Sequence, residues 1–312
     1  MAQEQNLSSP HTVNWGFVLF FSLMTLTTVI GVPLYLLRFG ISVPNLVIFT
    51  FWTVATTMAI TVGYHRLFAH FAFKTNSVIT FLCVFFGSAA FESSAVRWVA
   101  QHRDHHTYLD REGDPYNINE GFFHAYVGWI WFRVHRFNYY NAKDLLKSKL
   151  MRHQCRYYAL WFFVTGILIP TISGLATNDL LGSFLLNVVA RMTLVHHSSF
   201  LVNAVCHSFG KATYDSSSSA RDFWPGAFLT HGEAYHSFHH HFSLDYRHGV
   251  RWYDWDPSKW LIAFLAFMGL AWDLKRVPDA QILAAKRAAR QKPANKVPAP
   301  AWRETLRLES SR

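Results

Sequence analysis

The sequence predicts an all-α integral membrane protein, with four transmembrane helices and a cytoplasmic helical cap that carries a histidine-rich metal site. Three observations support this prediction. Hydrophobic residues make up 51% of the chain and charged residues only 15%, well below the roughly 25% typical of soluble domains. Several apolar runs reach the roughly 20 residues that a helix needs to cross a bilayer. The 18 histidines gather in a few short groups.

Four apolar runs are long enough to span a membrane. They cover residues 13–37, 41–64, 157–177 and 180–206. Short connectors join them in pairs, around Arg38 in the first pair and at Asn178-Asp179 in the second. We therefore expect two helical hairpins with almost no chain on the far side of the membrane.

Two further apolar segments are expected to lie at the membrane interface instead of crossing it. Residues 77–100 include Glu92 and Arg97, which are costly in lipid. Residues 260–272 are too short to span and are bracketed by two tryptophans, a pattern typical of interfacial helices.

The distribution of lysine and arginine predicts the orientation. These residues concentrate between positions 97 and 156 and again beyond position 211, whereas the hairpin connectors hold only Arg38. The positive-inside rule therefore places both termini and the metal site in the cytoplasm. The formal charge of +10 on so apolar a chain favours anionic lipid over nucleic acid as the partner.

We predict one domain over residues 1–284 and a basic C-terminal tail over 285–312. From about Ala284 we expect a short helix followed by a disordered segment, which either contacts anionic lipid or is solvated. The first residues hold no lysine or arginine ahead of the apolar run, so no cleaved signal peptide is expected. The three cysteines, Cys83, Cys155 and Cys206, show no disulfide pattern.

The histidines fall into groups whose spacing is typical of metal ligands. Two are H-x-x-H-H triplets, a third is H-x-x-x-x-H, and the last pairs an asparagine with a histidine four residues later. The candidate metal-binding residues are His65, His70, His102, His105, His106, Asn203, His207, His236, His239 and His240. The other histidines are expected to be surface or hydrogen-bonded residues: His11, His124, His135, His153, His196, His197, His231, His241 and His248.

Helical geometry shows how these groups could bind metal. Residues three and four apart share a helix face, so His102 aligns with His105 and His106. Adjacent histidines diverge by about 100°, so each triplet can serve two different ions. The five-residue step from His65 to His70 fits no regular helix face, so we expect the helix to end or distort there.

The number of histidines indicates two metal ions. Nine imidazoles exceed the four ligands of zinc or the six of iron, whereas two ions with four or five nitrogens each fit the count. Imidazole suits zinc, copper, nickel and iron, so spacing alone does not name the metal.

The ordered boxes H-R-L-F-A-H, H-R-D-H-H and H-S-F-H-H resemble those of the membrane fatty acyl desaturases, especially the delta-9 stearoyl-CoA branch. The resemblance covers about residues 63–276. It includes the stretches GDPYN, GFFHAYVGW, RYY, NAVCH and GEAYHSFHH.

The resemblance implies a di-iron centre with the nine grouped histidines as direct ligands and Asn203 holding a metal-bound water. It implies an enzyme that uses O2 to remove two hydrogens from an acyl chain and leaves a cis double bond. Neutral imidazoles are required, so metal affinity should fall as the pH falls. Four acidic residues are candidates to orient the histidine rings from behind: Asp104, Asp110, Asp114 and Glu233.

The resemblance also implies an apolar acyl tunnel and an external electron donor. The chain holds no H-P-G-G haem motif and no cysteine cluster, so we expect a cytochrome b5, a ferredoxin or a similar carrier. Trp98 either lines the tunnel or anchors the chain at the interface.

The acyl carrier is open between CoA and a membrane lipid ester. Arg133 matches a basic CoA-contacting position of the family. However, Ala100 and Gln101 stand where animal acyl-CoA members carry an Arg-Asp pair that contacts CoA.

Two other functions remain open. One is a hydroxylase that uses the same iron chemistry on a lipid or an alkane. The other is a non-enzymatic membrane protein that binds or transports metal. Two tightly bound irons per chain would favour either enzyme, and loosely held zinc or copper would favour transport.

Overall fold

The computed structural model describes residues 12–132 and 139–291. Within these residues, four helices are long and apolar enough to cross a membrane, as predicted. They cover Trp15–Phe39, Val43–Ala69, Tyr158–Thr177 and Leu180–Val205. The second continues five residues beyond the predicted end at position 64, because the first histidine box is itself helical.

Each spanning helix combines α-helical and π-helical turns, and the third also ends in a 3₁₀ turn. The first comprises α1 (Trp15–Leu26), a π-helical turn and α2 (Val32–Phe39), and the second α3 (Val43–Met58) and η2 (Ala59–Ala69). The third comprises α8 (Tyr158–Phe162), η7 (Phe163–Leu168), α9 (Ile169–Ile172) and η8 (Ser173–Thr177). The fourth comprises α10 (Leu180–Ser183), η9 (Phe184–Ala190) and α11 (Arg191–Val205).

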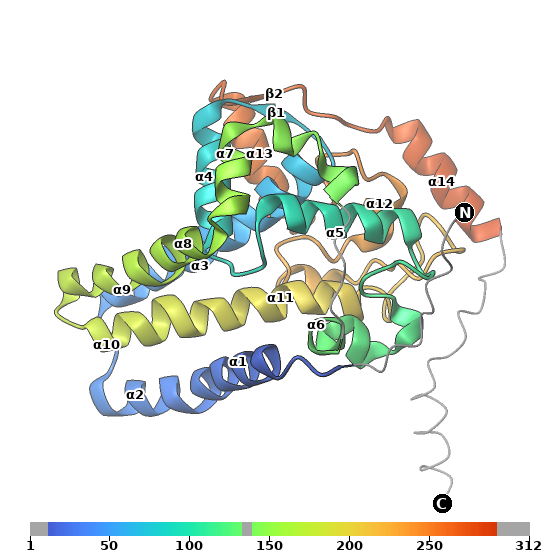
Figure 1. The fold of residues 1–312 in the computed structure, drawn as a ribbon. Coiled ribbons are helices and arrows are strands. Elements are labelled where there is room, and N and C mark those ends of the chain that lie inside the picture. The colour runs from blue at the N-terminus through green and yellow to red at the C-terminus, as the bar shows by residue number, and fades with distance from the viewer. Residues whose placement is uncertain (1–11, 133–138, 292–312) are drawn as a thin grey trace, which may run out of the picture.

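The two hairpins are tied together at the end far from the cap (Figure 1). Asn178 adopts the left-handed conformation with φ 53°, which ends the third span. Asp179 then caps α10, because its Oδ1 accepts from the Gly182 backbone N–H at 2.8 Å. Its Oδ2 accepts from the Tyr35 hydroxyl at 2.6 Å and from Asn45 Nδ2 at 2.8 Å.

Residues 77–100 form two helices and do not cross the bilayer. α4 (Ser77–Ser88) has 12 residues, so it rises only about 18 Å against an apolar core of about 30 Å. The chain then turns, and α5 (Ala95–Tyr108) follows its N-cap residue Ser94, whose side chain accepts from the Arg97 backbone N–H. The count of four spans is therefore confirmed.

A buried arginine holds the end of α4 inside the bundle. Arg191 donates to the carbonyls of Ala89 at 2.7 Å and Gly166 at 2.8 Å. Carbonyls at a helix C-terminus lack partners within the helix, and a cation there is favourable. Arg191 thus connects α4 with the third and fourth spans.

The remaining elements form a cap at the other end of the bundle (Figure 1). Its longer helices are α5, α7 (Lys149–Arg156), α12 (His236–His241), α13 (Pro257–Phe267) and α14 (Asp279–Gln291). Its shorter helices are η3 (Ile118–Glu120), η4 (His124–Gly128), α6 (Trp129–Trp131), η5 (Tyr139–Ala142), η6 (Leu145–Lys147) and η10 (Trp224–Ala227). Strands β1 (Lys74–Thr75) and β2 (Ala271–Trp272) pair antiparallel.

A short helix lies at the predicted boundary of the C-terminal tail. Residues 285–291 continue α14 past position 284, because Ile282 is buried and Ala285 packs with it against Tyr214 and Phe238. The rest of the predicted tail, residues 292–312, lies outside the described residues.

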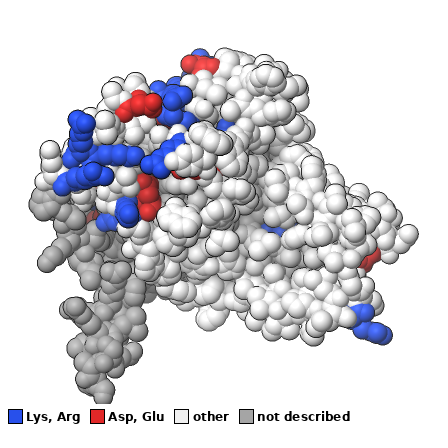
Figure 2. Space-filling view, turned by 180° about the vertical axis from the view of Figure 1, so that it is seen from behind, with Lys and Arg blue, Asp and Glu red and all other residues white. Residues whose placement is uncertain are grey.

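Charged side chains gather over the cap. Figure 2 shows most lysine, arginine, aspartate and glutamate side chains at the cap end, whereas the bundle is almost entirely uncharged on the face in view. Such a surface suits an apolar bilayer around the bundle and water around the cap.

Candidate metal centre

A distorted helix brings the first histidine pair to one face. Residues Ala59–Ala69 are π-helical, and the His70 backbone N–H donates to the His65 carbonyl at 3.1 Å. This bond joins residues five apart, which is the π-helical pattern and is frequent at functional sites. The predicted distortion between His65 and His70 is confirmed.

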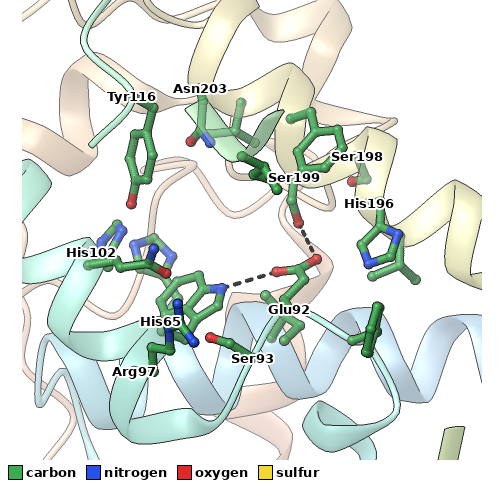
Figure 3. Close-up of a pocket in the computed structure, with 18 of the residues that line it drawn as sticks. His65, Glu92, Ser93, Arg97, His102, Tyr116, His196, Ser198, Ser199 and Asn203 are labelled. Atoms are coloured by element: carbon green, nitrogen blue, oxygen red, sulfur yellow. Dashed lines mark hydrogen bonds between the residues drawn. The ribbon is translucent and has the colours of Figure 1, made fainter. Parts of the chain in front are cut away.

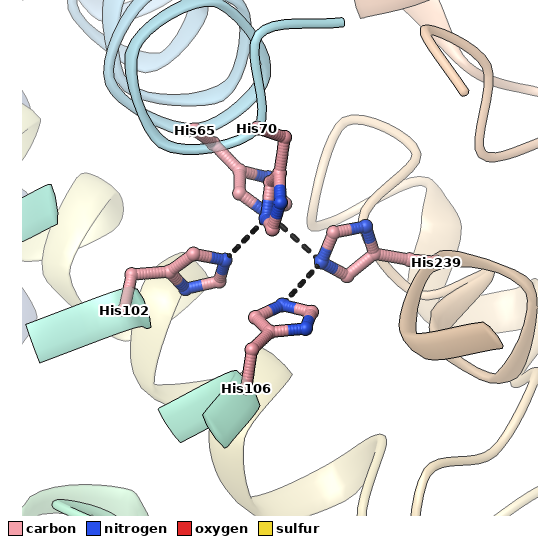
Figure 4. Close-up of side chains that lie close together, drawn as sticks. All are labelled: His65, His70, His102, His106 and His239. Carbon is pink, nitrogen blue, oxygen red and sulfur yellow. Dashed lines mark hydrogen bonds between the residues drawn. The ribbon is translucent and has the colours of Figure 1, made fainter. Parts of the chain in front are cut away.

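Five imidazoles form cluster A, in which one ring nitrogen of each lies within 4.8 Å of the others. Its members are His65, His70, His102, His106 and His239. His239 Nε2 lies 3.0 Å from His65 Nε2 and 2.9 Å from His106 Nε2, and His70 Nε2 lies 2.8 Å from His102 Nε2. Figure 4 shows the rings pointing toward a common centre from three separate chain segments.

Four imidazoles form cluster B, with the same mutual limit of 4.8 Å. Its members are His105, His207, His236 and His240. His236 Nε2 lies 2.9 Å from both His207 Nε2 and His240 Nε2, and His105 Nε2 lies 3.2 Å from His240 Nε2. Each triplet thus divides between the clusters. Asn203 lines the pocket that reaches His105 and His236.

Acceptors behind the rings hold several of them with Nε2 facing inward. His105 Nδ1 lies 2.8 Å from Asp114 Oδ1, and His65 Nδ1 lies 2.7 Å from Glu233 Oε2. An acceptor at Nδ1 places the proton there and leaves the Nε2 lone pair for a metal.

The other two acidic candidates lie farther from the rings. Asp110 accepts from the Ser219 hydroxyl, and Ser219 Oγ lies 2.6 Å from His207 Nδ1. Asp110 therefore acts on His207 only through Ser219. Asp104 instead accepts from Asn141 Nδ2 at 2.7 Å.

Two residues beside cluster A do not follow from the spacing of the histidines in the sequence. His248 Nδ1 lies 3.1 Å from Glu233 Oε2, and its ring centroid lies 4.4 Å from that of His239. Arg66 donates to Glu233 Oε1 at 2.9 Å. His248 follows no ligand spacing, so no sequence pattern indicates it, whereas Arg66 lies inside the first box and could have been considered.

Burial favours neutral imidazoles in both clusters. It lowers the pKa well below the ordinary value, and neighbouring imidazoles lower it further, for seven histidines: His70, His102, His106, His207, His236, His239 and His240. Neutral nitrogen donors of this kind fit a transition metal and not magnesium or calcium, which prefer oxygen. The donor sets therefore fit two transition-metal ions.

A pocket of about 420 Å³ borders the clusters and continues along α11. Trp98 lines it, with its ring stacked on His102 at a centroid distance of 5.0 Å. The Trp98 indole donates to Glu92 Oε2 at 3.0 Å, and the Ser199 hydroxyl donates to Glu92 Oε1 at 2.7 Å (Figure 3). Gln101 also lines the pocket. Arg133 lies outside the described residues.

Glu92 gives a prediction about stability and pH. Burial raises the pKa of Glu92 to about 7, although the bonds from Ser199 and Trp98 oppose this rise. The folded pKa is above the unfolded value of 4.5, so stability is lost as the pH rises from 4.5 through about 7. The loss approaches about 3 kcal/mol above that range. Glu92→Gln can still accept from Trp98 and should raise the thermal stability of the purified protein at pH 8 but not at pH 5.

Glu112 supplies the control for this measurement because it is exposed. Glu112→Gln should change stability equally little at both pH values. A Glu92→Gln protein no more stable than the wild type at pH 8 would contradict the expectation.

Comparison with known proteins agrees with this architecture. Residues 41–276 match the sequence model of the family described as fatty acid desaturase. The chain is 36% identical over 228 residues to a probable acyl-CoA desaturase of Schizosaccharomyces pombe, covering 72% of this chain but 48% of that protein. It therefore spans about half the length of that relative.

Two other relatives are matched over more of their length. The chain is 30% identical to stearoyl-CoA desaturase 5 of Bos taurus, with 76% of this chain and 72% of that protein covered. It is 28% identical to sn-1 stearoyl-lipid 9-desaturase of Anabaena variabilis, with 88% and 98% covered. The family match spans most of the chain and includes every clustered histidine, and the chain thus belongs to the fatty acid desaturase family.

Proposed function

We propose that this protein is an O2-dependent di-iron fatty acyl desaturase that introduces a cis double bond, at the delta-9 position, into a saturated acyl chain. One observation carries the proposal. Nine imidazoles from separate segments converge as two clusters beside a pocket that continues into the membrane bundle. The names of the matched relatives, which are acyl-CoA and acyl-lipid desaturases, support it.

Cluster A would hold one Fe²⁺ ion and cluster B the other, with Asn203 holding a water at the second. Together the ions supply the reduction of O2 to two waters, which takes two hydrogens from the acyl chain and two electrons and two protons from elsewhere. A cytochrome b5, a ferredoxin or a similar carrier would deliver the electrons at the basic cap. Protein groups behind the rings, such as Asp114 and Glu233, keep the nitrogens oriented.

The pocket residues position the chain and exclude water. Trp98 lies flat against His102, and its bond to Glu92 fixes the indole. Ser199 holds the other oxygen of Glu92 from α11. These three side chains form a fixed wall next to cluster A, so a methylene pair lying there is held against the metal site.

The acyl carrier is CoA or a membrane lipid, and both occur in the names of the relatives. The site and both termini face the cytoplasm in this proposal, which follows from the basic residues of the cap. Figure 2 supports this orientation, because the basic side chains in view gather at the cap end.

Expression in cells followed by fatty-acid profiling tests the function. New cis-monoenes at the delta-9 position that vanish in His105→Ala are the expected result. Hydroxylated products would instead indicate the lipid or alkane hydroxylase. If neither product forms when oxygen and an electron donor are supplied, the proposal that the protein is an enzyme of this kind is wrong. Metal analysis should find two irons per chain, whereas loosely held zinc or copper would indicate metal binding or transport.

A further inference from the structure

The pocket extends inward from the metal clusters along two spanning helices. On α11 it is lined by Asn203 and by His196, seven residues closer to the middle of the span. On the second span it is lined by His65 and by Thr57, eight residues deeper. At 1.5 Å per residue the inner end lies roughly 10 Å beyond the clusters. Only the part of an acyl chain farthest from its polar carrier reaches this depth.

His196 places a polar ring at this apolar depth. Its side chain is buried, with only 2% of the residue exposed. The ring stacks on Phe200 at a centroid distance of 5.9 Å and meets the edge of Phe21 at 5.0 Å. Figure 3 shows His196 across the pocket from His65 and His102, with Glu92 between them. The aromatic neighbours prevent the imidazole from turning toward water.

One ring nitrogen of His196 has no hydrogen-bond partner of normal geometry among the described residues. Its Nε2 is buried and makes no hydrogen bond of normal geometry, although the backbone carbonyls of Ala90 and Phe91 lie within reach of the ring. The adjacent His197 differs, because Nδ1 lies within hydrogen-bonding distance of the Tyr126 hydroxyl and Nε2 lies 3.1 Å from Thr25 Oγ1.

The other polar side chains at the inner end already have partners. The Thr57 hydroxyl donates to the Thr53 carbonyl at 2.9 Å, and Thr61 Oγ1 accepts from the Ser258 hydroxyl at 2.8 Å. A hydrocarbon end would therefore leave His196 Nε2 desolvated and without a partner, which costs free energy. A hydroxyl can donate or accept, so it would satisfy the ring in either neutral form.

We propose that His196 determines specificity by binding a hydroxyl group at the far end of the acyl chain, so that ω-hydroxylated acyl chains are substrates. This inference rests on the proposed acyl desaturase function. The hydrogen bond between the buried His196 ring and the hydroxyl should make desaturation of ω-hydroxylated chains roughly tenfold more efficient than desaturation of plain chains.

The test feeds cells that express the protein an equimolar mixture of stearic acid and ω-hydroxystearic acid. The cells attach both acids to their own CoA and lipids, so either carrier is available. We measure the desaturated fraction of each chain and take the ratio, which does not depend on the amount of folded protein. The expected wild-type ratio favours the ω-hydroxy chain.

Two variants separate the proposed contact from packing. His196→Leu should lower the ratio roughly tenfold, because it removes the polar atoms, whereas His196→Gln should retain much of it. An unchanged ratio in both variants would mean that His196 binds a water only and would overturn the proposal. Desaturated stearate without any ω-hydroxy product in the wild type would also overturn it while leaving the desaturase function intact. If neither chain is desaturated, both the role of His196 and the proposed desaturase function are wrong.

Discussion

Replacement of His239 by alanine is expected to empty cluster A and abolish activity. His239 Nε2 lies within 3.0 Å of the corresponding nitrogens of His65 and His106, so it joins the first and second boxes across the cluster. Loss of an outer hydrogen-bond partner alone costs 10- to 100-fold in affinity or activity, and loss of a ligand should cost more. We expect about one iron per chain and an activity loss of more than about 100-fold.

A matched control lies two residues away on the same helix. His241 is exposed and outside both clusters, so His241→Ala should keep two irons and nearly full activity. His207→Ala should in turn empty cluster B and leave cluster A filled. The two-cluster assignment is wrong if His239→Ala retains two irons, or if His241→Ala loses as much metal as His239→Ala.

Local patterns in the sequence were enough to predict the membrane spans and the grouping of the histidines. Run length and polarity separated the four spans from α4, because both reflect the cost of transfer into lipid. Triplet spacing predicted that His105 and His106 can serve different ions, because helix geometry fixes which face each side chain occupies.

Tertiary packing determined what the sequence did not reveal. The π-helical form of η2 depends on how the second span packs and not on residue propensity, so only some distortion near His65 could be expected. His248 reaches Glu233 because the loop after α12 folds back onto the second span. In the sequence, Glu92 indicated only that its segment does not cross the lipid. In the structure, its hydrogen bonds to Trp98 and Ser199 place it in the pocket wall.

Replacement of Arg66 by methionine is expected to destabilise the protein by about 3–5 kcal/mol. The guanidinium donates to both oxygens of Asp256, at 3.1 and 2.9 Å, and to Glu233 Oε1 at 2.9 Å. Arg66 and Asp256 are fully buried and Glu233 nearly so. Methionine retains much of the volume but leaves two buried carboxylates without this cation. Thermal unfolding of the metal-free protein in detergent measures the loss.

The effect of Arg66→Met should depend on pH in a defined direction. Burial opposes ionisation of Asp256, but Arg66 and His248 hold its pKa below the ordinary value. Burial likewise opposes ionisation of Glu233, whose pKa is held well below the ordinary value by His248, His65 and Arg66. Carboxyl groups whose pKa is lowered by folding stabilise the fold at pH values above their unfolded-state pKa. This contribution is lost as the pH falls through their folded-state pKa values. The destabilisation by Arg66→Met should therefore be full at pH 7.5 and smaller near pH 4.

Two further variants separate lost charge from lost packing. Arg66→Lys keeps the cation but cannot bridge two carboxylates with a planar fork, so an intermediate loss is expected. Adding Asp256→Asn to Arg66→Met removes one uncompensated charge and should recover part of the stability. Equal losses for lysine and methionine, or the same loss at pH 7.5 and pH 4, would mean that packing around Arg66 outweighs its charge. Glu233 also contacts the cluster A residue His65, and Asp256→Asn does not restore the contact between Glu233 and Arg66. The double variant should therefore recover more of the lost stability than of the lost metal affinity.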